Sequence, residues 1–194
     1  MKRFVFLLWA FSLAAWAAPE LPDAKLMEMI NQGREEGHLL TADKVRVIHP
    51  TDFPEVTVVG FLSGTNECLV GKALVENKLV SPAEACGMAL RAHGWEQADG
   101  PARVTLALQW LEQAQLGFGE SILRTRPLHF GDKWTPYTPL DTLANLSGSV
   151  RVICWVEKPP NGEPRRRFHK NIYWFGKDGR MLRSKVLDTF ELDS

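Results

Sequence analysis

Residues 166–190 have the sequence RRFHKNIYWFGKDGRMLRSKVLDTF and indicate the architecture of this chain more clearly than any other segment. Two runs rich in aromatic and aliphatic residues, 166–175 and 181–190, flank the short polar sequence 176–179. Asp178-Gly179 in a tight turn supplies the backbone freedom that an antiparallel hairpin requires. The sequence therefore predicts two antiparallel strands joined by this turn.

A third run, residues 150–156, extends the predicted hairpin to a three-stranded meander. Strand alternation puts Val152, Cys154 and Val156 on one purely apolar face and Trp155 on the other. Cys154 is therefore expected in the core. The alternative is a nucleophile activated by His169 on the adjacent strand, but no catalytic signature surrounds the cysteine.

The middle of the chain is predicted to be helical. Residues 81–84, Ser-Pro-Ala-Glu, form a capping box in which Ser81 caps the helix and Glu84 occupies its third position. This helix is expected to end near Ala92, with Gly94 as its stop signal.

A second helix is predicted to begin at Gly100-Pro101 and to reach about Leu116. Its apolar residues recur at helical spacing. The alternative is a bend near Gly117, after which the helix continues to Leu123.

The N-terminal part combines one helix with short strands. A helix is predicted over residues 22–34, and strands over 45–48 and 56–62. Residues 66–80 fit either a strand that begins at Cys68 or a helix, and the helix is preferred because a helix cap follows directly.

This order predicts an α+β fold rather than an alternating α/β fold. The helices cluster in the middle and pack on a C-terminal antiparallel meander, with one or two extra N-terminal strands. We expect a single α+β domain over residues 18–194. A subdivision near residue 126 is possible, into a mainly helical part (18–126) and a mainly β part (127–194).

The first 17 residues have the features of a secretory signal peptide. Lys2 and Arg3 precede the apolar run 4–16, and Ala15 and Ala17 provide small residues for cleavage after Ala17. The apolar run is shorter than the roughly 20 residues that a helix needs to span a bilayer. The protein is therefore expected to be soluble and exported, to the periplasm or beyond the cell, with no stable membrane span.

Composition and the absence of known motifs argue against several classes of function. The chain has 23 basic and 23 acidic residues, and this balance argues against a dedicated nucleic-acid binder. No zinc motif, phosphate-binding glycine loop, dinucleotide fingerprint or hydrolase elbow is present. We therefore expect no metal, no cofactor and no catalytic residue that the sequence can identify.

Three cysteines raise the question of a disulfide in an exported protein. Cys68 and Cys86 are the expected pair, with Cys154 as a buried free thiol. The alternatives are three buried thiols and, after that, an intermolecular bridge.

The strongest concentration of charge lies in the second strand of the meander. Basic and aromatic side chains on one sheet can bind a phosphate, a polyanionic sugar or another anion. The alternative is a solvated strand whose long basic side chains cover the sheet. The candidate ligand-binding residues are Arg165, Arg166, Arg167, His169, Lys170, Trp155 and Trp174.

These features predict an exported, non-catalytic binding or accessory module of the cell envelope. Its expected partner is an anionic ligand or an envelope protein. The first alternative is a small hydrolase or transferase whose active site is dispersed along the chain. The second is a structural partner in an envelope assembly, in which the tryptophan-rich sheet forms the interface.

Overall fold

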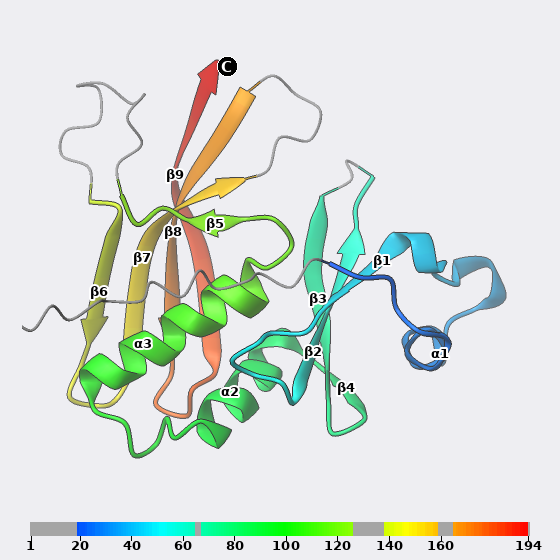
Figure 1. The fold of residues 1–194 in the computed structure, drawn as a ribbon, viewed down its shortest axis with the longest axis horizontal. Coiled ribbons are helices and arrows are strands. Elements are labelled where there is room, and N and C mark those ends of the chain that lie inside the picture. The colour runs from blue at the N-terminus through cyan, green and yellow to red at the C-terminus, as the bar shows by residue number, and fades with distance from the viewer. Residues whose placement is uncertain (1–18, 65–66, 126–137, 159–164, 194) are drawn as a thin grey trace, which may run out of the picture.

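The computed structural model describes residues 19–64, 67–125, 138–158 and 165–193. The predicted signal peptide, residues 1–17, lies outside them. The fold is α+β, with helices in the middle of the chain, N-terminal strands and a C-terminal antiparallel meander, as predicted (Figure 1). The possible subdivision near residue 126 falls at the margin of an undescribed segment. None of the helices in the described residues is both long and apolar enough to cross a bilayer.

The N-terminal half begins with a short helix and then forms an antiparallel sheet. Helix α1 (Ala24–Asn31) is capped by Asp23, whose carboxylate accepts a hydrogen bond of 2.7 Å from the Leu26 amide. Short 3₁₀ turns at Glu36–His38 and Ala42–Lys44 lead into the sheet. Its strands pair in sequence order and are β1 (Val45–Ile48), β2 (Val56–Leu62), β3 (Cys68–Val75) and β4 (Lys78–Val80).

The helix preferred for residues 66–80 is wrong, because residues 68–80 form the β3–β4 hairpin. Val75 pairs with Lys78 across a two-residue loop. Glu76 and Asn77 in this loop have φ angles of 49° and 61°, as a type I′ hairpin turn requires. The first part of the chain therefore carries a four-stranded sheet besides its helices.

Two longer helices follow the first sheet. Helix α2 (Pro82–Ala92) begins at the predicted cap, where the Ser81 hydroxyl accepts a hydrogen bond of 3.2 Å from the Glu84 amide. Helix α3 (Gly100–Trp110) continues as a π-helical turn, Leu111–Gln115. The chain then forms a short strand instead of continuing as a helix to Leu123.

The C-terminal half forms the second sheet, in which the predicted meander is confirmed. Strand β7 pairs with β8 and β8 with β9, while β5 and β6 pair with the other edge of β7. Strand β6 was not predicted from the sequence. The strands are β5 (Ser121–Ile122), β6 (Leu140–Ala144), β7 (Val150–Lys158), β8 (Arg165–Phe175) and β9 (Met181–Asp193).

One cluster of buried side chains joins both sheets to α2 and α3. Val58 from the first sheet and Val152 from the second belong to it, together with Leu90 and Trp110 from the helices. Figure 1 shows α3 along the second sheet and α2 between the two sheets. Cys154 is fully buried in this cluster, which confirms its predicted place in the core.

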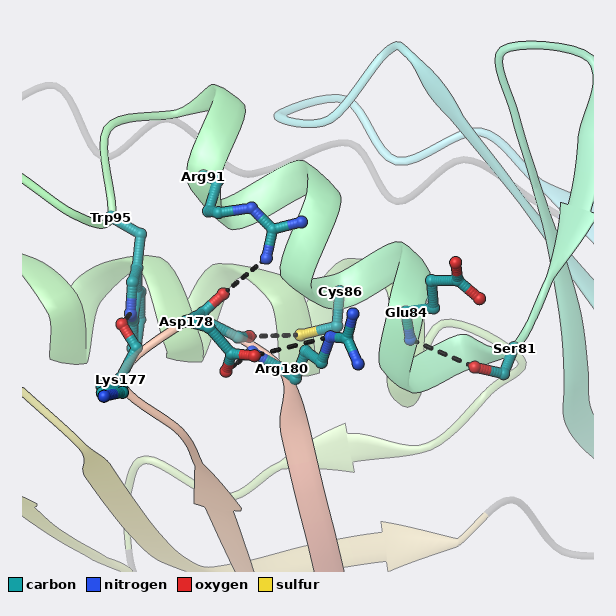
Figure 2. Close-up of polar contacts among 9 residues, drawn as sticks. Ser81, Glu84, Cys86, Arg91, Trp95, Lys177, Asp178 and Arg180 are labelled. Carbon is teal, nitrogen blue, oxygen red and sulfur yellow. Dashed lines mark hydrogen bonds and ion pairs between the residues drawn. The ribbon is translucent and has the colours of Figure 1, made fainter.

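The β8–β9 turn is held against α2 and against Trp95, which follows the helix (Figure 2). Three successive backbone carbonyls of the turn accept hydrogen bonds from side chains. Lys177 accepts from Trp95 Nε1 at 3.0 Å, Asp178 from Arg91 Nη1 at 3.0 Å, and Gly179 from Cys86 Sγ at 3.3 Å. We call these three bonds the turn clamp. It fixes the start of the second sheet's last strand against α2.

Candidate functional site

The candidate basic residues are divided between the two faces of the second sheet. We call the face that packs against α3 the inner face and the opposite one the outer face. Directly paired residues share a face, so His169, opposite Val156, lies on the inner face with Arg167. Lys170, opposite Trp155, lies on the outer face.

Trp174, paired with Arg151, and Arg166 also belong to the outer face. The seven candidate residues therefore do not form one site. The side chain of Arg165 lies outside the described part of the structure.

Two of the candidate arginines are held by carboxylates. Arg166 Nη2 lies 2.6 Å from Glu157 Oε1, and its Nε donates to the same oxygen at 2.8 Å. Arg167 Nε lies 3.0 Å from Glu191 Oε1. These ion pairs reduce the net positive charge of the Arg165–Lys170 segment.

The outer face carries two further cations that are not among the residues predicted from the sequence. Arg183 and Lys185 on β9 lie opposite Trp174 and Ile172 on β8, and both are exposed. The Arg183 guanidinium lies 4.0 Å from the centre of the Trp174 ring, a cation–π contact. With Lys170 they form a basic and aromatic strip, which we call the outer basic patch: Lys170, Trp174, Arg183 and Lys185.

The tryptophan candidates have different environments. Trp155 is 5% exposed and belongs to a small core with the fully buried Phe168. Arg166 lies over the Phe168 ring at 5.3 Å. Trp174 is half-buried and keeps part of its ring at the surface. Trp155 therefore supports the sheet, and Trp174 is the tryptophan that a ligand can reach.

The inner face carries a polar group at the end of the sheet nearest β5. Glu120 lies 3.4 Å from Lys158, and His169 Nδ1 lies 3.2 Å from the Thr189 hydroxyl. Burial raises the pKa of Glu120, although Lys158 opposes this shift. Burial lowers the pKa of His169, and the nearby charges of Lys158 and Arg167 lower it further.

Cys154 is not an activated nucleophile in this arrangement. It lies opposite Asn171, whereas His169 lies opposite Val156. Burial raises the pKa of the Cys154 thiol to about 12, and the carboxylates of Glu112 and Glu120 add to this effect. A thiol with such a pKa is protonated at neutral pH.

A second surface feature lies between α1 and the first sheet. It is a depression of about 310 Å³ lined by residues that include Asp23, Lys25, His49 and Asn77. Each of these four side chains is exposed. Within the described residues, no group of His, Cys, Asp and Glu side chains is arranged to hold a metal ion.

All three cysteines are free thiols, so the structure shows no Cys68–Cys86 disulfide. Cys86 is buried in the turn clamp, where its thiol donates to Gly179. Cys68 begins β3, opposite Leu62, rather than lying on a helix next to α2.

We predict that the denatured protein, without reductant, contains three titratable thiols. In the native protein these thiols should react slowly with a disulfide reagent at pH 8. Burial raises the pKa of Cys68, the most accessible of them, to about 11, so only about a thousandth of it is thiolate at that pH. A count of one thiol after denaturation would show that a disulfide exists.

Comparison with known proteins adds no relative. No family model, no curated protein and no solved structure matches this chain. The geometry of the chain is therefore the basis for a functional assignment.

Proposed function

We propose that this protein is an exported, non-catalytic binding module of the cell envelope that holds an anionic ligand on the outer basic patch. The export part of the proposal rests on the signal-like sequence 1–17. The binding part rests on one observation, the stacking of Arg183 on a half-buried Trp174 beside two further cations.

Two cations of the outer basic patch have no ion-pair partner among the described residues. These are Lys170 and Lys185, although Asp188 lies opposite Lys170 in the sheet register. The chain as a whole has no net charge. The excess of cations on the outer face therefore comes from the way the fold groups them there. An anion with several phosphate, sulfate or carboxylate groups could contact several of these side chains at once.

Trp174 adds a second kind of recognition. A flat ring beside cations can stack on a sugar or another ring while the charges hold its anionic groups. Stacking also holds the Arg183 guanidinium in place before the ligand arrives. Less side-chain freedom is then lost on binding.

The Arg183→Ala/Lys185→Ala variant should bind heparin at least tenfold more weakly than the unmodified protein. A charge-assisted hydrogen bond contributes roughly 1.5–3 kcal/mol, and about 1.4 kcal/mol corresponds to tenfold in affinity. The measurement is the dissociation constant at fixed salt, together with the salt concentration that elutes the protein from a heparin column.

The matched control is Arg166→Ala/Arg167→Ala, which removes the same amount of positive charge from the neighbouring strand. Because Glu157 and Glu191 already hold these arginines, the control should weaken binding less than the test variant does. Equal weakening by both variants would mean that net charge alone governs retention. Either that result or a failure of the unmodified protein to bind heparin would reject the proposed ligand surface.

A further inference from the structure

Strand β9 forms one edge of the second sheet. It pairs with β8 on one side, and no described strand pairs with it on the other. It is also long, with 13 residues. Figure 1 shows its last part projecting at the margin of the molecule. An edge of this kind offers a row of backbone donors and acceptors to another strand.

The edge also exposes apolar side chains. Leu182, Val186 and Leu187 are 64%, 52% and 45% exposed. Edge strands are commonly protected by charges, prolines or bulges, and β9 has two register shifts relative to β8. These register shifts leave the apolar side chains at the surface. Covering the edge with a partner would therefore bury exposed apolar area.

The charges along β9 identify what would cover it. On the outer face, the first half of the strand carries the cations Arg183 and Lys185, whereas the second half carries Asp188; Glu191, opposite Arg167, lies on the inner face. Two such strands in antiparallel order, centred between Val186 and Leu187, place Lys185 of each beside Asp188 of the other on this face. Opposite charges across a strand pair are stabilising, and like charges are destabilising. The strand is therefore complementary to itself in the antiparallel direction only.

We propose that β9 pairs with β9 of a second copy of this chain around a two-fold axis. The contact joins the two second sheets into one sheet that runs through the dimer. A contact of this type uses the same patch on both copies, the commonest arrangement in homodimers. The two-fold axis is perpendicular to the joined sheet, so both outer faces lie on the same side of it.

Three proteins test this pairing. Arg183→Glu/Lys185→Glu leaves only acidic charges on the outer face of the strand, and Asp188→Lys leaves only basic charges there while sparing the Arg167–Glu191 pair of the inner face. The unmodified protein should have twice the chain mass by light scattering at about 100 µM, a concentration at which pairs with micromolar Kd associate. Each variant alone should have the mass of a single chain.

Mixing the two variants should restore the double mass, because the acidic strand of one then faces the basic strand of the other. This rescue also shows that both variants are folded. The control Lys72→Glu/Lys78→Glu changes exposed lysines of the first sheet by the same charge and should remain dimeric.

An unmodified protein of single mass, variants that remain dimeric, or a mixture that stays monomeric would each overturn the pairing. The masses are measured without polyanion, because Arg183 and Lys185 also belong to the outer basic patch. An unmodified protein that dimerises but does not bind heparin would count against the proposed function and not against this pairing.

Discussion

Replacing Trp95 by alanine is expected to lower the free energy of unfolding by about 3–5 kcal/mol, the usual cost of truncating a buried tryptophan. The Trp95 side chain is fully buried and lies against Phe175, with 6.3 Å between the ring centres. Its Nε1 also donates to the Lys177 carbonyl in the turn clamp. The variant therefore loses apolar burial and leaves a turn carbonyl without its partner.

Urea unfolding followed by circular dichroism measures this loss as a lower midpoint at unchanged slope. Trp95→Phe separates the two contributions, because it keeps most of the ring and removes the donor. Its expected cost is about 1–3 kcal/mol, the penalty for an unpaired buried acceptor. Trp174→Ala is the control, since this half-buried ring has a surface cation–π contact of roughly 0.5–1 kcal/mol. Equal losses at Trp95 and Trp174 would contradict the role of Trp95 as the anchor of the turn.

Local signals in the sequence predicted both sides of the turn clamp but not their contact. Ser81 and Glu84 identified the start of α2, and Asp178-Gly179 identified the turn of the last hairpin. The contact joins Cys86 to Gly179, which are 93 positions apart. A cap and a turn are set by a few neighbouring residues, whereas their docking depends on how both sheets pack around the helices.

The wrong helix over residues 66–80 has a different cause. Leu69, Ala73 and Leu74 fit a helical stripe, and the residues in the turn are Glu76 and Asn77, without a glycine. Asparagine tolerates the left-handed conformation, but glutamate seldom adopts it. The tertiary pairing of β3 with β2 imposes this turn, and the local sequence indicates it only weakly.

The candidate site was partly predictable. The alternation of side chains along 150–156 correctly placed Cys154 in the core. The same alternation along the next strand could have placed Arg167 and Lys170 on opposite faces of the sheet. Counting outward from the predicted turn would also have brought Arg183 near Trp174, although the register shift beside Phe175 changes the partners by one residue. The carboxylates that hold Arg166 and Arg167 follow from the full register, which the sequence does not determine.

Replacing Gly179 by alanine is expected to lower the free energy of unfolding by about 2–4 kcal/mol, the sum of a backbone and a packing cost. Gly179 has a φ of +79°, which L-residues rarely adopt. A Cβ at this position would lie 3.1 Å from Leu90 Cβ and 3.4 Å from Trp95 Cγ. Since Leu90 and Trp95 are fully buried, neither can move away without disturbing the core.

Gly33→Ala separates the two costs, because Gly33 has nearly the same φ, +78°, and a Cβ added there would meet nothing within 4 Å beyond its chain neighbours. This control should lose only the backbone contribution, about 1–2 kcal/mol. The difference between the two variants in urea unfolding then measures the close approach of the turn to α2. If both variants lose the same stability, the turn is not in tight contact with Leu90 and Trp95, and the turn clamp has room for a methyl group. If Gly179→Ala loses more, the last hairpin is seated on α2 through a contact that only glycine permits, and the position of β9 depends on it.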